Sequence, residues 1–458
     1  MANDWKEVSL GEIGRVVTGK TPKTKVIENF GHEIPFITPR DMDDQRIISE
    51  TERYLSKVGS VSVKNSIIPA NSISVSCIGS DMGKSAITKY LSVTNQQINS
   101  IVVSDEFYYK FVYYNLSSRK AEIRGLAGGS AQPILNKSDF SQIKMFVPPL
   151  SEQKAIAHIL GSLDDKIELN RQMNETLEAM VQALFKSWFV DFDPVIDNAL
   201  AAGNAIPDEF IERAEQRKAI EKKDNAEIQD LFPDEFEFTE EMGWVPKGWA
   251  IRNLSEMVSI IIDHRGKTPK KLGGDWAESG YPAISAKNIK GNKLVRPDTI
   301  RFVDKDIYDK WMKVPLEVGD VIMTSEAPLG ELYYLNSKVD YLLSQRLYAI
   351  RADKINCTGS YLFYWFQTEF GSAEIQNRAT GTTVFGIKQS ELRKVLVLCP
   401  PSSVLESFDK YSHVLLEKMD ANDLSITELA KLRDTLLPKL MSGELRIADA
   451  AALVDEAI

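Results

Sequence analysis

The sequence predicts an α+β protein, in which two mixed α/β domains are related by a pseudo-two-fold axis. Two long antiparallel coiled-coil helices are expected to join these domains. One observation behind this prediction is that short segments of the first half recur, in the same order, in the second half. The other is that each copy precedes a long stretch whose apolar residues recur every three or four positions, as in a coiled coil.

The internal repeat is clearest in one pentapeptide. "GKTPK" at 19–23 recurs at 266–270. Upstream, "WKEVSLGEI" matches "WAIRNLSEM", and downstream "FVPPLSEQ" at 146–153 matches "LCPPSSVL" at 398–405. Each copy is far longer than a solenoid repeat, so the pattern indicates two duplicated domains.

The internal repeat and the Pro-Pro pairs before each long helix indicate where the parts of the chain begin and end. These parts are a first domain (1–150), a central long helix (151–189), an acidic helical connector (190–245), a second domain (246–401), a C-terminal long helix (402–447) and a tail (448–458). Within the domains, β-rich runs predict strands at 72–78, 98–104, 319–325 and 345–351. Aromatic-rich helices are expected at 106–118 and 360–370, with their rings in the domain cores.

Both long helices carry a seam with alternating steps of three and four. In the first helix the inward positions are Ile156, Leu160, Leu163, Ile167, Asn170, Asn174, Leu177, Val181, Leu184 and Trp188. In the second they are Phe408, Ser412, Leu415, Met419, Asn422, Ile426, Leu429, Arg433, Leu436 and Leu440. Asn170 and Asn422 occupy the same repeat position, where a polar residue costs stability but fixes the register. We expect the helices to pair, because packing each one only on its own domain would leave a long apolar stripe in water.

Charge is distributed unevenly along the chain. The net charge is -10, yet residues 191–241 hold 16 Asp and Glu against 5 Lys and Arg. The two repeated domains are therefore mildly basic, which is compatible with a nucleic-acid partner but is also common on solvated surfaces.

Several classes of protein find no support in the sequence. The absence of a long apolar run or a signal-peptide core predicts no membrane span and no export. The three cysteines lack metal-ligand spacing and fit a reduced cytoplasmic protein, and the four scattered histidines predict no metal site.

Two short patterns raise the question of catalysis. "GRVVTGKT" at 14–21 matches a P-loop, but the second copy lacks the first glycine and no helical pattern follows Thr21. Pro207, Asp208, Glu221 and Lys223 match a loose nuclease pattern, yet they lie on a charged helical segment instead of adjacent strands. We therefore predict no catalytic residues. An autonomous P-loop NTPase using Gly14, Lys20 and Thr21 remains an alternative, as does an assembly scaffold that does not bind DNA.

The candidate binding residues lie in equivalent loops of the two copies. Amides, small hydroxyls and cations in such turns suit phosphate oxygens, and Arg, Asn and Gln side chains can pair with base edges. An ordinary surface turn is the alternative interpretation of each loop. The candidate residues are Lys20, Thr21, Lys23, Arg40, Gly129, Ser130 and Gln132 in the first copy, and Lys267, Thr268, Lys270, Lys287, Asn288, Gly381, Thr382 and Thr383 in the second.

With these features in place, the chain resembles the specificity subunits of Type I restriction-modification systems over nearly its whole length. The most specific segment is "VPPLSEQKAIAHILGSLDDKIELNRQMNETLEAMVQALFKSWFVDFDP" at 147–194. "WKEVSLGEI", "LFPDEFEF", "GWVPKGW" and the terminal "LRDTLLPKLMSGELRI" are also similar. The second Pro-Pro segment, "PPSSVLESF", departs from the usual start of the family's helix.

The resemblance implies a function without catalysis in this chain. It implies that the two domains are target-recognition domains, each reading one half of a split, asymmetric DNA site, with the paired helices fixing the spacer. Two methyltransferase subunits are expected as partners, supplying S-adenosylmethionine and methylating adenine at N6. Motor-nuclease subunits would use ATP and Mg²⁺ for restriction.

Overall fold

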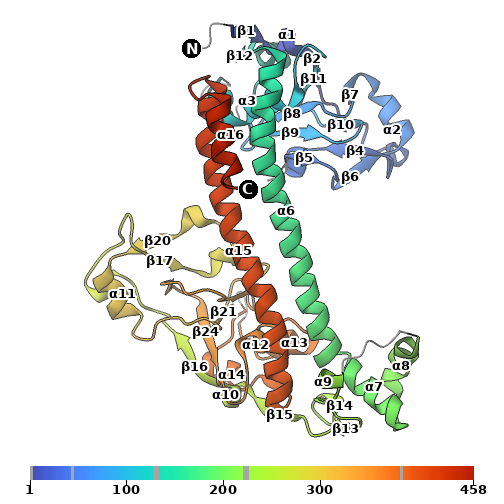
Figure 1. Cartoon of the computed structure of the whole chain (residues 1–458), viewed down its shortest axis with the longest axis vertical. Coiled ribbons are helices and arrows are strands. Elements are labelled where there is room, and N and C mark those ends of the chain that lie inside the picture. The colour runs from blue at the N-terminus through green and yellow to red at the C-terminus, as the bar shows by residue number, and fades with distance from the viewer. Residues whose placement is uncertain (1–3, 43–45, 127–133, 220–225, 382–384) are drawn as a thin grey trace. The chain divides into compact units, whose positions relative to one another are not determined.

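The structure is a computed structural model that describes residues 4–42, 46–126, 134–219, 226–381 and 385–458 (Figure 1). The chain divides into two compact units. Unit 1 comprises Met1–Asn170 and Leu424–Ile458, and unit 2 comprises Arg171–Asp423. Each unit holds one copy of the repeat together with a part of both long helices.

The strands of unit 1 form two main sheets and one additional pair. The strands are β1 (Lys6–Ser9), β2 (Gly14–Thr18), β3 (Phe30–Gly31), β4 (Ile34–Ile37), β5 (Ile47–Ile48), β6 (Arg53–Leu55), β7 (Ile67–Ile68), β8 (Ile73–Ser76), β9 (Ser85–Thr88), β10 (Ser92–Thr94), β11 (Ile98–Val103) and β12 (Lys144–Val147). One sheet has the order β2-β11-β8-β9-β5, the other the order β3-β6-β4-β10-β7, and β1 pairs with β12. Strand β11 is antiparallel to β2 and β8, whereas β10 runs parallel to β4.

The strands of unit 2 repeat this pattern. They are β13 (Phe236–Thr239), β14 (Gly243–Pro246), β15 (Ala250–Asn253), β16 (Val258–Asp263), β17 (Tyr281–Ile284), β18 (Ile289–Lys290), β19 (Lys293–Leu294), β20 (Arg301–Val303), β21 (Val321–Thr324), β22 (Leu332–Tyr334), β23 (Leu342–Leu343), β24 (Leu347–Ala352) and β25 (Leu396–Cys399). Strand β24 is antiparallel to β16 and β21, as β11 is to β2 and β8, and β23 runs parallel to β17, as β10 does to β4. The duplication seen in the sequence is thus also a duplication of strand pairing.

Shorter helices accompany these sheets. In unit 1 they are α1 (Leu10–Ile13), α2 (Lys57–Ser62), α3 (Tyr109–Ser118), α4 (Lys120–Leu126) and α5 (Lys137–Gln142). In unit 2 they are α7 (Asp193–Ala202), α8 (Ile211–Lys218), α9 (Ala226–Gln229), α10 (Leu254–Met257), α11 (Lys305–Trp311), α12 (Gly359–Trp365), α13 (Glu369–Asn377) and α14 (Gln389–Leu392). Among them, α3 and α12 pack on strands of their own unit. Aromatic side chains of α3 and α12, including Phe111, Tyr114, Tyr361 and Trp365, are buried, as expected.

The long helices pair antiparallel within each unit, which confirms the predicted fold class. They are α6 (Leu150–Phe189) and α15 (Ser402–Met441). In unit 1, Arg433 Nη1 lies 2.8 Å from Asp164 Oδ1, and Asn170 Nδ2 donates to Ser425 Oγ at 3.1 Å. The apolar seam residues there share one core with the domain, and they include Ile156, Leu160, Leu163, Leu429, Leu436 and Leu440.

The half of the pair that belongs to unit 2 is polar at one end and aromatic at the other. Asn422 Nδ2 donates to Asn174 Oδ1 at 2.8 Å, and Asn174 Nδ2 donates to Met419 O at 3.3 Å. Farther along, the rings of Phe185 and Phe408 are 5.5 Å apart. The two asparagines that share a repeat position, Asn170 and Asn422, therefore make hydrogen bonds between the helices, which removes most of the cost of burying them.

The expected C-terminal end requires a correction. Helix α15 ends at Met441, not at 447, because the chain turns at Gly443, whose φ of 69° is left-handed. A further helix, α16 (Ile447–Asp455), occupies most of the segment expected to be a tail. Its residues Ala450 and Val454 are buried in the core of unit 1.

The acidic connector belongs to unit 2 and is only partly helical. Helices α7, α8 and α9 are followed by the hairpin β13–β14, which the sequence did not predict. Its acidic residues are not all solvated, since buried Asp193 accepts from Arg213 Nε and Nη2, both at 2.7 Å. Burial alone would raise the pKa of Asp193, but hydrogen bonds from Arg213 and Ser187 and the nearby charge of Arg217 hold this pKa below its usual value.

Candidate nucleic-acid interface

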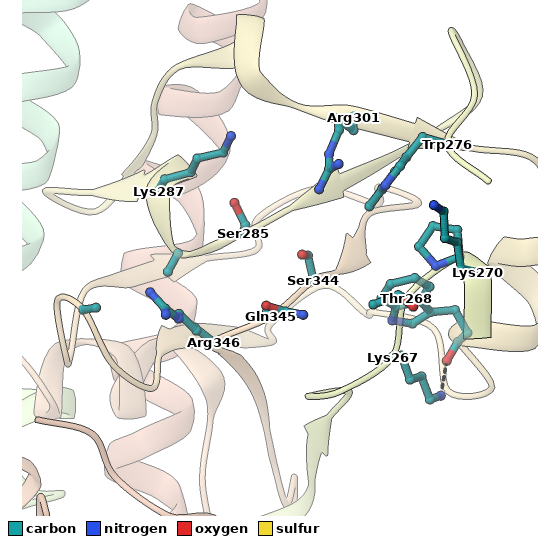
Figure 2. Close-up of a pocket in the computed structure, with 14 residues that line it drawn as sticks. Lys267, Thr268, Lys270, Trp276, Ser285, Lys287, Arg301, Ser344, Gln345 and Arg346 are labelled. Carbon is teal, nitrogen blue, oxygen red and sulfur yellow. Dashed lines mark hydrogen bonds between the residues drawn. The ribbon is translucent and has the colours of Figure 1, made fainter. Parts of the chain in front are cut away.

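The predicted loop of the second copy lies beside a pocket in unit 2. Strand β16 ends at Asp263, and the following turn brings Lys267, Thr268 and Lys270 to the pocket wall. Lys287, from a separate loop after β17, lines the same pocket, whose volume is about 500 Å³ (Figure 2). Four of the candidate residues chosen from the sequence therefore meet at one site.

Other lining residues were missed by the sequence analysis. These are Trp276, Arg301, Ser344, Gln345 and Arg346. The guanidinium of Arg301, at the start of β20, lies 3.7 Å from the centroid of the Trp276 ring, a cation–π contact between a strand and a separate loop. The sequence pattern at 345–351 predicts only a strand, although the polar side chains of Gln345 and Arg346 at its start are a signal of a binding surface.

The electrostatics of the pocket favour an anionic ligand. Its walls carry the cationic side chains of Lys267, Lys270, Lys287, Arg301 and Arg346. Glu326 pairs with Arg346, with Oε1 2.9 Å from Nε. Lys267 Nζ donates to the carbonyl of Trp311 at 2.7 Å, and burial together with the charge of Lys313 lowers the pKa of this lysine.

His264 lies directly before this turn and is buried. Burial, followed by the charge of Lys267, lowers its pKa to about 4, although Asp263 acts in the opposite direction. Its Nε2 has no hydrogen-bond partner among the described residues. The imidazole is therefore neutral near pH 7 and does not add to the positive charge of the pocket.

The prediction that Asn288 contacts DNA requires a correction. Its side chain is fully buried, and its Oδ1 accepts from Ser285 N at 3.1 Å and from Ser285 Oγ at 2.8 Å. Its Nδ2 lies within hydrogen-bond distance of three oxygens, Val295 O, Arg296 O and Thr299 Oγ1, at 3.3, 3.2 and 3.0 Å. All of these bonds close the loop that presents Lys287, so Asn288 has a structural role.

In the first copy, hydrogen bonds hold the predicted loop at Lys20 and Thr21 against β10 and the residues that follow it. Lys20 N donates to Thr94 O at 2.8 Å, and Thr21 Oγ1 donates to Gln96 Oε1 at 2.6 Å. Lys20, Lys23 and Arg40 are exposed, and Arg40 lies in the 3-10 helix η2 (Pro39–Met42) that follows β4. These side chains are accessible to a ligand.

The Gly/Ser/Thr turns could be placed only in part. Gly129, Ser130, Gln132, Thr382 and Thr383 lie outside the described residues. Exposed Gly381 directly follows Thr380, whose N–H donates to Gly386 O at 2.9 Å and whose carbonyl accepts from Gly386 N at 3.1 Å. Ile387 N donates to Ser325 O at 3.0 Å, and Ser325 is followed by Glu326, the ion-pair partner of Arg346.

The P-loop pattern does not form a P-loop. Gly14 begins β2, where a Cβ would clash with the carbonyl of Val102 on the neighbouring strand. Along the described chain, the first α-helix after Thr21 is α2, far beyond the position where a phosphate-binding helix must start. In the nuclease pattern, Asp208 lies in a 3-10 turn, whereas Glu221 and Lys223 lie outside the described residues.

In the part of the chain that the structure describes, no group of three or more His, Cys, Asp or Glu residues is arranged to hold a metal ion. Every helix in that part is too short or too polar to cross a membrane.

These features define a class of duplicated α+β proteins with paired long helices and a basic loop in each copy. The chain belongs to the Type I restriction modification DNA specificity domain family, whose model matches residues 2–179 and 246–430. It is 27% identical over 451 residues to the Type I restriction enzyme MjaIX specificity subunit of Methanocaldococcus jannaschii, covering 97% of this chain and 94% of that protein. It is 26% identical over 477 residues to the HindI specificity subunit of Haemophilus influenzae, covering 97% and 100%.

A solved structure supports the fold. The S subunit of a Type I restriction-modification system from M. genitalium superposes with a TM-score of 0.53 and 16% identity, covering 96% of this chain and 97% of that one. At this identity the likeness concerns the fold alone. The predicted family and fold class are thus confirmed.

Proposed function

We propose that this chain is the DNA-binding specificity subunit of a Type I restriction-modification complex and reads a bipartite, asymmetric site. The observation that carries the proposal is the repeated construction of the candidate site. In unit 1 a Gly-Lys-Thr turn lies against the segment before the central strand and carries exposed Lys20 and Lys23, and in unit 2 the equivalent turn and segment line one pocket with cationic walls. Two related but different basic surfaces suit two different half-sites.

In this proposal the chemistry belongs to partner subunits. Two methyltransferase subunits bind S-adenosylmethionine and methylate adenine at N6, after the base has been flipped out of the duplex. Motor-nuclease subunits bind ATP and Mg²⁺ and cut unmodified DNA. This chain supplies the site selection, and its two long helices fix the spacer between the half-sites. Its three free cysteines suit a reduced, cytoplasmic setting.

Methylome sequencing tests the proposal directly. Cells that carry the partner subunits are compared with and without this chain, and N6-methyladenine is mapped at base resolution. We expect one split motif with a fixed spacer that is methylated only when the chain is present. An identical methylation pattern in both strains would overturn the proposal.

The two alternatives give different results. An assembly scaffold would join the methyltransferase complex but leave its sequence preference unchanged. A nucleotide-hydrolysing enzyme would turn over ATP in the isolated chain, and Lys20→Ala would abolish that turnover. A DNA-reading subunit instead binds its site with an affinity that falls steeply as salt is raised.

A further inference from the structure

A three-residue segment occupies the same place in both copies, between a parallel strand and the central strand. In unit 1 it is 95–97, between β10 and β11, and in unit 2 it is 344–346, between β23 and β24. The flanking register is matched, since Thr94 pairs with Ile37 in the first copy and Leu343 pairs with Ile284 in the second. The two segments are therefore equivalent residue by residue.

Hydrogen bonds of the backbone fix both ends of each segment. In unit 1, Asn95 N donates to Ile37 O at 2.9 Å, and Cys77 N donates to Gln97 O at 2.7 Å. In unit 2, Ser344 N donates to Ile284 O at 2.8 Å, and Ser325 N donates to Arg346 O at 2.9 Å. Side chains on such segments are held by the sheets, which is the rigid support that sequence readout needs.

In unit 1 the basic turn lies directly against this segment, and in unit 2 the equivalent turn and the segment line one pocket. A Cβ on Gly19 would clash with the carbonyl of Asn95, so only glycine allows the turn to approach this closely. In unit 2, Gln345 and Arg346 line the same pocket as Lys267 and Thr268. Figure 2 shows Arg346 and Lys267 on opposite sides of that pocket, with Gln345 between them.

The side chains that point away from the sheet differ between the copies. The first copy has exposed Gln96 and half-buried Gln97, whereas the second has Gln345 and Arg346, both exposed. Asn95 Nδ2 donates to Gln97 Oε1 at 2.9 Å and so orients this amide. Glu326 likewise orients Arg346, with Oε1 2.9 Å from Nε of the guanidinium.

The chemistry of these groups matches different bases. A guanidinium fork donates two hydrogen bonds to O6 and N7 of guanine, whereas a carboxamide accepts from N6 and donates to N7 of adenine. Lysine ammonium groups, such as those of Lys267 and Lys270, bind phosphate as point charges. The segment and the turn therefore suit two different parts of the same DNA.

We propose that segments 95–97 and 344–346 are the base-reading elements of the two half-sites. Arg346 reads a guanine in one half-site, and Gln97 reads an adenine in the other. The lysines of the adjoining turns contact phosphate and carry no sequence information. This inference rests on the proposed function, since it names the residues by which the chain would select its site.

The test uses the full chain with its methyltransferase subunits and the motif found by methylome sequencing. Binding is measured by competition with a panel of duplexes in which one base pair of the motif is changed at a time. For wild type we expect each change to weaken binding by roughly 5- to 150-fold. Arg346→Gln should lose this discrimination at one G·C pair of one half-site and leave the other half-site unchanged.

Two further substitutions test the reader of the other half-site and a lysine that contacts phosphate. Gln97→Arg should change the preference from adenine to guanine at one position of the opposite half-site. Lys270→Gln should weaken binding to every duplex by a similar factor and leave all preferences intact. The matched control is Lys354→Gln, which removes an exposed cation just past the other end of β24 and should change neither affinity nor preference.

The outcomes separate this inference from the proposed function. If wild type shows no preference among the duplexes, the proposed function fails and the inference fails with it. If wild type discriminates but Arg346→Gln keeps every preference, or weakens all duplexes equally, the base-reading role is overturned and the proposed function stands. Thermal melting checks each variant, and if Arg346→Gln is unfolded, the Gln97→Arg result decides.

Discussion

The buried His264 makes unit 2 sensitive to mild acid. Its pKa of about 4 lies below the usual value of 6.5, so between these values the unfolded chain binds a proton that the folded chain does not. The contribution of this neutral histidine to the free energy of unfolding is therefore complete above pH 6.5 and is lost as the pH falls toward 4. With a discount for solvent screening, we expect this residue to cost about 1 kcal/mol of unfolding free energy between pH 7 and pH 5.

Melting temperatures at the two pH values check this prediction. His264→Gln should show a smaller fall in melting temperature from pH 7 to pH 5 than wild type does. His158→Gln, which changes an exposed histidine of α6, serves as the control and should keep the wild-type difference. Equal falls for wild type and His264→Gln would contradict the prediction.

Asn288 provides a second test at the residue scale. Asn288→Ala leaves the carbonyls of Val295 and Arg296 and the hydroxyl of Thr299 without this amide donor, and we expect a loss of about 2 kcal/mol of unfolding free energy. Its exposed neighbour gives the matched comparison, since Lys287→Ala should change stability by less than about 0.5 kcal/mol but weaken DNA binding. Urea denaturation measures the first effect, and a stable Asn288→Ala variant would refute it.

The candidate site was predictable from the sequence only where the repeat pointed to it. Lys267, Thr268 and Lys270 were found because "GKTPK" occurs twice, and these residues do line a pocket. Arg301 and Trp276 were missed because their contact joins the start of β20 to a separate loop, a relation without a sequence pattern. Asn288 was misjudged because a polar residue among lysines looks exposed, whereas its amide was needed to close the loop.

At the scale of elements, the two asparagines that face each other in the seam of the long helices should be energetically coupled. Asn174 and Asn422 face each other in unit 2 at 2.8 Å. Either single substitution, Asn174→Leu or Asn422→Leu, buries the remaining amide without this partner and should cost about 1 to 2 kcal/mol. The double variant removes both amides and should be as stable as wild type or more stable.

A double-mutant cycle by denaturant unfolding measures this coupling. We expect the two single losses to exceed the loss in the double variant by at least about 1 kcal/mol. Losses that simply add would mean that the two amides do not support each other. The pair Leu177→Ala and Leu415→Ala provides apolar seam positions for comparison, for which no such rescue is expected.

Elements with a strong period were predicted well, and short ones were not. The apolar seam predicted both long helices, because few structures other than a paired helix fit an uninterrupted heptad pattern. The end of α15 was misplaced, since the turn at Gly443 interrupts a sequence that still looks helical. The hairpin β13–β14 was missed because its few alternating residues follow a charged helical run.

At the scale of the whole molecule, charge is separated along the chain. Some acidic residues of the connector form ion pairs, as Asp193 does with Arg213, so not all of them contribute negative charge to the surface. The net charge of -10 therefore says little about partners, and the placement of the cations says more. This explains how an acidic chain can suit a polyanion.

The composition of unit 1 has a consequence for how the protein is made. Its core needs residues from both ends of the chain, since Leu436, Leu440, Ala450 and Val454 pack with the first domain. Unit 2 is one continuous stretch, Arg171–Asp423. As the chain leaves the ribosome, unit 1 must wait for Leu424–Ile458 to emerge. We therefore expect unit 2 to fold before unit 1 during synthesis, the reverse of the usual order.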